Sequence, residues 1–454
     1  MSSALVTSVG GIPGRATATD RSATALAVCL AGLCMLLMGA VLAFGAVDIW
    51  ATSLLEVSAV LLLGLWAACQ GQSVGQRLKW TPLYPPLLVF GALVCAQIAL
   101  NLSVYRYATL LAGLQYVAFC ALLLLAVQVT GDERSSNFFL LTVGLFGVAV
   151  AIFAICQNLS APGKLYWVRT PLSGSAVYGP YVNHNHYAGL MEMLTPLALV
   201  LSLSRLVHGG QRMLAAFAAV LMAGSIVLSG SRSGTFSLIV ELAFLFWIAS
   251  QVRRRTGLRY GLLLLVFCLL GFLAWVGSGD LWHHLGDLQD ATRPAILKDG
   301  LRMFRLQPIF GWGLGTFPTA YPAYRSFYTD LFVNAAHNDY LQALVETGAL
   351  GFACVVWFVA VLYRRAFKQI TNWNHNWDGA LRVAALTGCT GLLVHSAFDF
   401  NLQIPANAAF FCVLCAVATN FSGPRNEKPS ARRAVISFRT KSSLEPTEAA
   451  EWTI

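Results

Sequence analysis

Histidine, arginine, amide and acidic side chains gather in a few short segments of this chain. The segment Tyr181–Tyr187 mixes aromatic rings with amides and imidazoles, and Arg232 stands in Ser229-Gly-Ser-Arg-Ser-Gly. A third segment, His337–Asp339, joins an imidazole, an amide and a carboxylate. Amides and imidazoles suit sugar hydroxyls, and the planar guanidinium of arginine binds phosphate through two hydrogen bonds. The small residues around Arg232 leave room for a large anionic group to approach it.

Other kinds of chemistry find less support in the residues. His184 and His186 are two apart, so on a helix they point to different sides, and Asp339 and Asp399 add no defined ligand spacing. We therefore expect no tight metal site. The sequence contains no Walker-type loop, no dinucleotide-binding glycine pattern and no nucleophile elbow. We expect no cofactor, and an enzyme of this kind would draw its energy from the substrate itself.

The elements that position these groups are membrane helices. Hydrophobic residues make up 57% of the 454 residues and charged residues 11%, against about 25% charged in ordinary soluble domains. Long continuous apolar stretches recur, and helices are the elements that satisfy their own backbone in lipid. The sequence predicts an all-α polytopic membrane protein with about twelve transmembrane helices. They begin near Ala25, Ile49, Pro85, Ala108, Phe138, Tyr187, Met213, Thr235, Gly261, Glu346, Ala380 and Gln403.

The positive charges predict the orientation of these helices. With both termini in the cytoplasm, 21 of the 30 lysines and arginines fall on the cytoplasmic side, as the positive-inside rule requires. The net charge of +10 is therefore a sign of topology and gives no reason to expect nucleic acid as a partner. The remaining nine cations fall outside: Arg106, Lys164, Arg169, Arg232, Arg293, Lys298, Arg302, Arg305 and Arg325.

This topology divides the chain into five parts. Residues 1–24 form a cytoplasmic tail, residues 25–276 carry the first nine helices, and residues 277–345 form one large periplasmic catalytic loop between helices nine and ten. Residues 346–421 carry the last three helices, and residues 422–454 form a polar, disordered cytoplasmic tail. The loop is too long for an idle connection, so we expect short helices in it.

With this topology, titratable groups from distant segments meet at one depth on the outer face. They include His184 and His186, His337 and His395, with Arg232 and Asp399. Arg106 and Arg169 are interpreted as charges that lipid excludes. Glu192 lies one or two turns into its helix, so it should face the interior, either paired or protonated. Asn338 or Asp339 is expected to orient the ring of His337, and Glu346 to fix the start of the tenth helix.

Two stretches carry a resemblance to a known family. The sequence His337-Asn-Asp-Tyr-Leu-Gln-Ala-Leu-Val-Glu-Thr-Gly-Ala-Leu-Gly-Phe resembles a motif of the O-antigen ligase and O-antigen polymerase superfamily. The segment Arg293–Phe317 is similar to a second family feature, and the serine-arginine turn at Arg232 to a third. Together the similar regions span roughly Pro180 to Ala409.

The resemblance implies a metal-independent, inverting glycosyltransferase at the periplasmic face of the bacterial inner membrane. Its donor would be a glycan linked to undecaprenyl pyrophosphate. His337 corresponds to the family's essential histidine, the catalytic general base, and Arg232 and Arg293 to the arginines that hold the donor pyrophosphate. Histidine ordinarily titrates near pH 6.5, which suits this task. The candidate glycan- or substrate-binding residues are Tyr181, Asn183, His184, Asn185, His186, Asn338, Asp339, His395 and Asp399.

Members of the superfamily use different acceptors, and several of these acceptors are compatible with the sequence. The segments Tyr181–His186 and His395–Asn407 are more similar to the polymerases of O-antigen and exopolysaccharide repeat units, whose acceptor is a growing glycan. The alternative is a ligase that transfers glycan to lipid A core, or an enzyme that glycosylates protein. A transporter of lipid-linked glycan would place ionisable groups at the midplane, where only Glu56, Glu192 and Glu241 are candidates. Further expected partners are membrane lipids and other polysaccharide-assembly proteins.

Overall fold

The computed structural model describes residues 18–71, 78–171, 176–252, 266, 270–271, 288–330, 332–370 and 373–420. Within these residues the structure has 13 α-helices, four short 3-10 helices and no strand, apart from two isolated bridges. Eight of the described helices are long and apolar enough to cross a membrane. The prediction of an all-helical polytopic membrane protein is therefore confirmed. The number of crossings stays a prediction, because the ninth span, expected near Gly261, lies outside the described residues.

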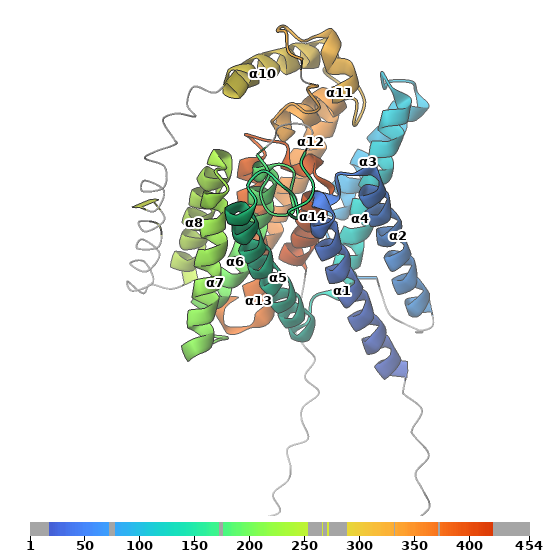
Figure 1. Cartoon of the computed structure of the whole chain (residues 1–454). Coiled ribbons are helices and arrows are strands. Elements are labelled where there is room, and N and C mark those ends of the chain that lie inside the picture. The colour runs from blue at the N-terminus through green and yellow to red at the C-terminus, as the bar shows by residue number, and fades with distance from the viewer. Residues whose placement is uncertain are drawn as a thin grey trace, which may run out of the picture. The chain divides into compact units, whose positions relative to one another are not determined.

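The described helices follow the predicted spans closely, and the other eleven predicted starts fall in or within two residues of a helix (Figure 1). The elements are α1 (Ala18–Leu42), η1 (Phe44–Ala46), α2 (Ile49–Gly71), α3 (Tyr84–Ala99), α4 (Arg106–Val129), α5 (Glu133–Ser160), α6 (His184–Leu203), α7 (Gly209–Leu228), α8 (Arg232–Val252), α10 (Leu288–Leu306), α11 (Phe317–Ala320), η2 (Tyr321–Ala323), α12 (Asp339–Phe367), η3 (Trp373–His375), α13 (Trp377–His395), η4 (Asn401–Gln403) and α14 (Pro405–Thr419).

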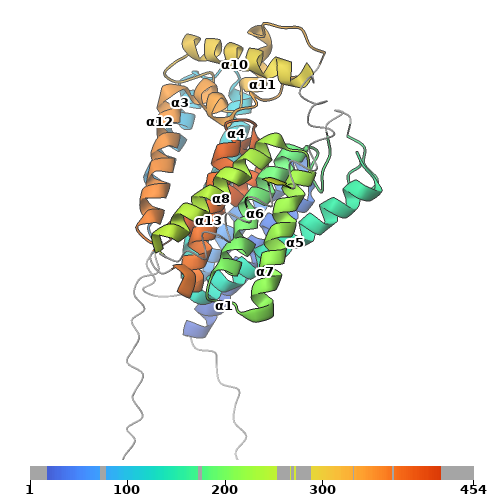
Figure 2. The ribbon, with the colours of Figure 1, turned by 90° about the vertical axis from the view of Figure 1, so that its left-hand side faces the viewer.

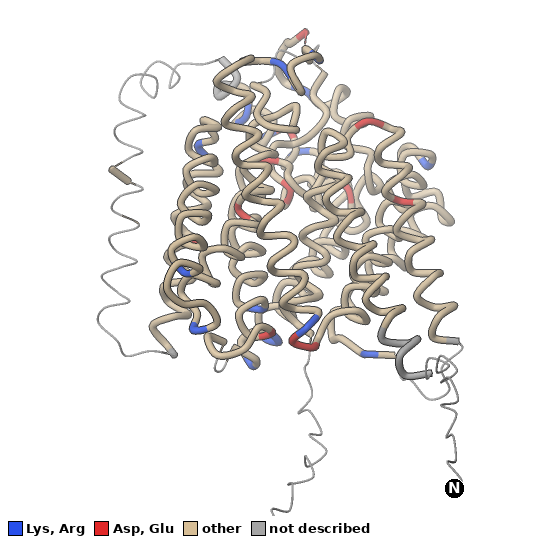
Figure 3. The backbone as a smooth tube through the Cα atoms, turned by 60° about the horizontal axis from the view of Figure 1, so that its bottom comes forward, with Lys and Arg blue, Asp and Glu red and all other residues tan. Residues whose placement is uncertain are grey.

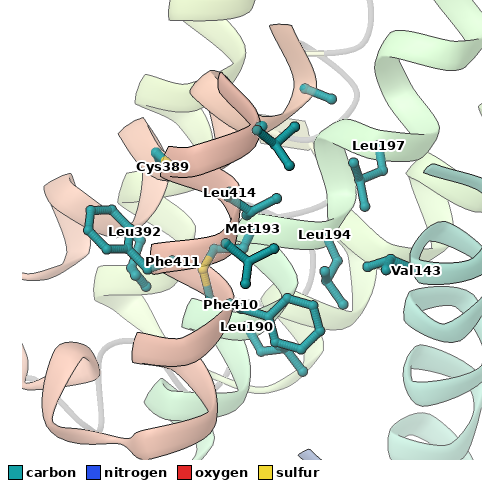
Figure 4. Packing of buried hydrophobic residues seen from close by; sticks show 14 of the residues in the cluster. Val143, Leu190, Met193, Leu194, Leu197, Cys389, Leu392, Phe410, Phe411 and Leu414 are labelled. Carbon is teal, nitrogen blue, oxygen red and sulfur yellow. The ribbon is translucent and has the colours of Figure 1, made fainter. Parts of the chain in front are cut away.

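The centre of the bundle is formed by α6, α13 and α14. The apolar window of α6 is 94% buried, against 17% for α2, which marks α6 as an interior helix and α2 as a peripheral one. Figure 4 shows Leu190, Met193 and Leu194 of α6 packing against apolar side chains of α13 and α14. At Gly388 a Cβ would lie 2.7 Å from the backbone oxygen of Met193. Glycine thus lets α13 approach α6 closely, as small residues do between membrane helices.

The two ends of the bundle differ in charge and in the residues they carry. One end, here called the site end, carries the N-termini of α6, α8 and α12 and the C-terminus of α13. The opposite end, here called the basic end, carries Lys79, Arg205, Arg212 and Arg382. There the Lys79 ammonium donates to the Gln128 carbonyl at 2.9 Å, and Arg212 to the Ser204 carbonyl at 2.9 Å. In Figure 3 the basic residues gather toward the two ends, while acidic residues also occur within the bundle.

Helices α10 and α11 cover the site end above the start of α12, as Figures 1 and 2 show from two directions. A small second core joins them to α12 and includes Ile296, Met303, Phe317 and Leu341. The expectation of short helices in the loop 277–345 is confirmed by α11 and η2, of four and three residues, whereas α10 in the same loop is a longer helix of 19 residues.

Glu346 holds the glycine-rich loop that leads into α11. Its two carboxylate oxygens accept from the backbone N–H groups of Gly315, at 2.9 Å, and Phe317, at 3.1 Å. The expectation that Glu346 fixes the helix start was wrong for the first turn of α12, which begins at Asp339 with Asn338 as its N-cap. Gly348, at φ 64° and ψ −170°, interrupts α12 two residues after Glu346, so hydropathy marks only the apolar part that follows this kink.

Candidate active site

Side chains from five segments meet at the site end. These segments are the starts of α6, α8 and α12, helix α10, and the turn between α13 and α14. Arg293 of α10 donates to the carbonyl of Phe398 in that turn at 3.3 Å, and the backbone N–H of Asp339 donates to the Ser396 carbonyl at 2.8 Å. The turn is therefore the junction at which α10 and α12 meet the central helices.

Asp399 in this turn holds the ring of His337. Oδ1 of Asp399 lies 3.2 Å from Nδ1 of His337, and Oδ2 accepts from the Asn185 amide at 2.6 Å. Burial alone would raise the pKa of Asp399, but the hydrogen bond with His337 and the nearby histidines lower it below the usual range. The group is thus a carboxylate, which accepts the proton on Nδ1 and leaves the lone pair on Nε2 of the neutral ring.

The exposure and the backbone conformation of His337 are those of a side chain that can react with a ligand. Its side chain is 28% exposed, whereas that of Asp399 is 0% exposed. Its φ of 50° lies in the left-handed region, which is strained for a residue with a side chain and is often found at functional sites. A partly open imidazole with a fixed tautomer can accept a proton from a ligand at Nε2.

Phe400 forms a wall between two of the predicted site histidines. Its ring centroid lies 4.9 Å from that of His337, at 78°, and 4.7 Å from that of His186, at 75°. His186 is buried, and its Nε2 has no hydrogen-bond partner among the described residues. The edge-on packing fixes both rings, so Phe400 is a site residue that the sequence prediction missed. Its type and its place next to Asp399 give no chemical signal.

Side chains of the segment 181–186 hold the start of α6 against α14 and against the turn before α8. Tyr181 is 1% exposed and its hydroxyl donates to the Asn407 amide oxygen at 2.7 Å. Asn183 is the N-cap of α6, accepting from the backbone N–H of Asn185 at 2.8 Å. His184 joins α6 to the turn before α8, because its Nδ1 donates to the Ser229 carbonyl at 2.9 Å. Their predicted role in substrate binding stays a prediction.

Asn338 and Asp339 do not orient the His337 ring, and this expectation was wrong. Asn338 caps α12 by accepting from the backbone N–H of Leu341 at 2.9 Å, and its amide donates to the Ala397 carbonyl at 2.8 Å. Asp339 is buried and accepts from the backbone N–H of Leu402 at 3.0 Å. Both residues are occupied in joining α12 to the α13–α14 turn.

The predicted arginines reach the site end from two sides. Arg293 contacts the turn that carries Asp399, and Arg232 is exposed at the first position of α8. Arg169 instead forms an exposed ion pair with Asp48 at 2.7 Å, in line with its interpretation as a charge excluded from lipid. Among the described residues no three histidine, cysteine, aspartate or glutamate side chains are grouped as metal ligands would be.

Glu192 lies below this level and is paired, as expected. Its Oε1 lies 2.8 Å from Nδ1 of His395, and both side chains are 0% exposed. The other nitrogen of His395 lies 2.9 Å from Oγ of Ser233. Ser233 and this link between α6, α13 and α8 were not predicted. The two pairings span 203 and 162 residues, and no local pattern marks them.

Comparison with known proteins agrees with this arrangement. A family model described as O-antigen ligase matches residues 217–356, from within α7 to within α12, and so includes Arg232, Arg293 and His337. A search of curated proteins gave no match. The matched residues contain three of the five segments that build the site end, namely the start of α8, helix α10 and the start of α12. Residues 217–356 are therefore similar to the O-antigen ligase family, and this similarity supports a glycan-transferring membrane protein.

Proposed function

We propose that the protein transfers glycan from an undecaprenyl-pyrophosphate-linked donor to a hydroxyl group of a sugar acceptor, as a polymerase of repeat units. The observation that carries this proposal is the pairing of His337 with Asp399 of the α13–α14 turn, which Arg293 also contacts. In the reaction Nε2 of His337 takes the proton of the acceptor hydroxyl, and the acceptor oxygen attacks C1 of the donor sugar. The C1–O bond breaks and the pyrophosphate leaves with its electron pair.

Attack on C1 from the side opposite the leaving pyrophosphate inverts the configuration at C1. The carboxylate of Asp399 stabilises the imidazolium that forms as His337 takes the proton. A general base of this kind contributes about 10²- to 10⁴-fold in rate. Because the side chain of Asp399 is 0% exposed and also binds Asn185, the pair is held in place before substrate arrives.

Arg232 and Arg293 are proposed to bind the pyrophosphate. The departing group gains one negative charge, and two guanidinium groups stabilise that charge without a metal ion. Arg232→Lys and Arg293→Lys keep the positive charge but lose the two-pronged hydrogen bonding, so each should lower kcat/KM by about tenfold to hundredfold. Transfer assays of both variants in detergent, with elution from a sizing column as a folding control, test this role. Normal rates in both would make them surface charges.

The choice between polymerase and ligase depends on the acceptor. The polymerase proposal rests on the similarity of segments 181–186 and 395–407 to the polymerase branch. The family model described as O-antigen ligase favours transfer to lipid A core as the second candidate. Purified full-length protein should be given a synthetic lipid-linked repeat unit, with and without lipid A core. A ladder of products supports the polymerase, and a single addition to lipid A core supports the ligase.

The same assay tests metal independence. Transfer should continue at an unchanged rate in the presence of a chelator, because arginines supply the positive charge. Loss of transfer with the chelator, followed by recovery with one added divalent ion, would contradict this part of the proposal.

The site end is proposed to face the periplasm of the inner membrane, with both chain termini in the cytoplasm. In support, the cations assigned to the cytoplasm that the structure describes lie at the basic end, and those assigned outside lie at the site end. Reporter fusions at Gln289 and Trp373 should show periplasmic and cytoplasmic activity, respectively. The same result at both positions would contradict this topology.

A further inference from the structure

Two buried side chains join the start of α8 to the centre of the bundle. Nδ1 of His395 lies 2.8 Å from Oε1 of Glu192, and Nε2 of the same ring lies 2.9 Å from Oγ of Ser233. His395 and Glu192 are both 0% exposed, whereas Ser233 is half-buried. His395 therefore cannot touch a ligand itself, and its effect on the site passes through Ser233.

The burial of His395 and Glu192 determines how many protons these two side chains share. If Nδ1 carried the only proton, the pair would have a net negative charge, which is costly in a low-dielectric interior. A second proton makes the pair neutral. On Oε2 of Glu192 that proton would have no acceptor among the described residues, so it lies either on the imidazolium or on Oε1, where it faces Nδ1. In both of these forms Nε2 carries a hydrogen.

The groups around the pair favour the same state. Asp339 and Asp399 act electrostatically on His395 in the direction that favours its protonation. Acidic groups from α12 and from the α13–α14 turn thus oppose an extra negative charge on the pair. The second oxygen of Glu192, Oε2, is buried and has no hydrogen-bond partner among the described residues.

The hydrogen on Nε2 sets the direction of the Ser233 hydroxyl. Nε2–H donates to Oγ, so the hydroxyl hydrogen must point elsewhere. The nearest acceptor side chain is Ser231, whose Oγ is 3.4 Å away and already accepts from the backbone N–H of Gly234 at 3.0 Å. That contact is too long to hold the hydroxyl firmly. Ser233 thus has a hydrogen-bond donor to offer next to Arg232.

We propose that Ser233 donates a hydrogen bond to the pyrophosphate of the glycan donor, and that Glu192 and His395 are positioning residues that direct its hydroxyl. This inference rests on the proposed function. When the C1–O bond breaks, the pyrophosphate gains one negative charge, so a donor fixed in advance stabilises the transition state more than the bound substrate. The partial positive charge at the N-terminus of α8 acts in the same direction.

The first test is substitution of Ser233 in the full-length protein, assayed with a synthetic undecaprenyl-pyrophosphate repeat unit. Ser233→Ala should lower kcat by about tenfold to hundredfold with a smaller change in KM, because it removes one hydrogen bond to a charged group. Ser233→Thr keeps a hydroxyl and should recover most of the rate. The control is Ser250→Ala on the same helix, where the hydroxyl donates only to the Trp247 carbonyl at 2.8 Å.

The second test separates positioning from a structural role. In His395→Asn the amide nitrogen takes the place of Nδ1 and keeps the bond to Glu192, but the N–H toward Ser233 is lost. The loss in kcat should equal that of Ser233→Ala, and the double variant should be no worse than either single one. Additive losses would mean that His395 acts independently of Ser233 and would overturn the proposal. If His395→Asn does not fold, the Ala and Thr variants of Ser233 decide.

The outcomes also separate this inference from the proposed function. Normal kcat in Ser233→Ala, with active wild type and active Ser250→Ala, refutes the role of Ser233 alone. Covalent labelling of Ser233 by a fluorophosphonate would refute it too, because that would make the serine a nucleophile. If the wild type transfers no glycan from the lipid-linked donor, the proposed function and this inference fall together.

Discussion

The site end contains two pairs of a histidine and a carboxylate that differ in burial. In the first, Nδ1 of His337 lies 3.2 Å from Asp399, and the His337 side chain is 28% exposed. In the second, Nδ1 of His395 lies 2.8 Å from Glu192, and neither side chain is exposed. The carboxylate is buried in both pairs, so what differs is the access of the histidine ring to a ligand.

This difference in exposure implies different chemical roles for His337 and His395. His337 has one nitrogen held by Asp399 and one available at the surface of the site, which suits an exchange of protons with a ligand. His395 has both nitrogens engaged, by Glu192 and by Ser233, and has no route to a ligand. We infer that the first pair reacts and that the second positions a neighbour. A histidine near a carboxylate is therefore a candidate base only when its second nitrogen can reach substrate.

The largest expected effect is that of removing the His337 ring. His337→Ala should reduce kcat by about 10²- to 10⁴-fold, the usual contribution of a general base, while donor binding by the arginines persists. His337→Gln should recover little, because an amide cannot accept the proton. Turnover and binding of the lipid-linked donor are measured separately. Near-normal turnover in the alanine variant, or loss of donor binding with turnover kept, would remove the contrast between the two pairs.

The sequence predicted the helices and the group of polar residues at the site end because lipid imposes both. Apolar stretches must be helical, and polar groups such as His184, Arg232 and His337 must collect at a helix end or in the interior. The partners of these groups were not predictable in the same way. His337 and Asp399 are 62 residues apart, and only the packing of α12 against the α13–α14 turn brings them together.

Predictions from neighbours in the sequence also failed where a side chain forms hydrogen bonds with the backbone at a helix start. Asn338 and Asp339 are adjacent to His337, which made them natural candidates to orient its ring. The first turn of α12, however, needs a cap, and Asn338 supplies it. Asp339 meets the backbone of Leu402 instead of the imidazole. Neighbours in sequence at a helix start are thus less available to a site than residues of a facing turn.

A smaller expected effect is that of Asp399→Asn, and it distinguishes the two pairs by pH. The pKa of Asp399 is lowered, despite burial that opposes this, by the hydrogen bond with His337 and by nearby histidines. Asp399 is therefore ionised in any assay above about pH 4. Replacing it with asparagine removes the charge that stabilises the His337 imidazolium, so kcat/KM should fall by about tenfold to hundredfold. A weaker base is also protonated at lower pH, so the acid limb of the profile should move to lower pH.

Glu192→Gln is the matched variant for the second pair. It alters the buried partner of His395 and should lower kcat through Ser233, but the acid limb should stay where it is in the wild type, because His395 takes no proton from substrate.

The stability of the folded protein gives a second readout of Asp399. A carboxylate with a lowered pKa stabilises the fold above the ordinary aspartate pKa of about 3.9, and this contribution is lost as the pH falls through the folded value. Thermal unfolding of Asp399→Asn should therefore occur well below that of the wild type at pH 7, with the gap closing in acid. An acid limb that moves in Glu192→Gln and not in Asp399→Asn would reverse the roles of the two pairs.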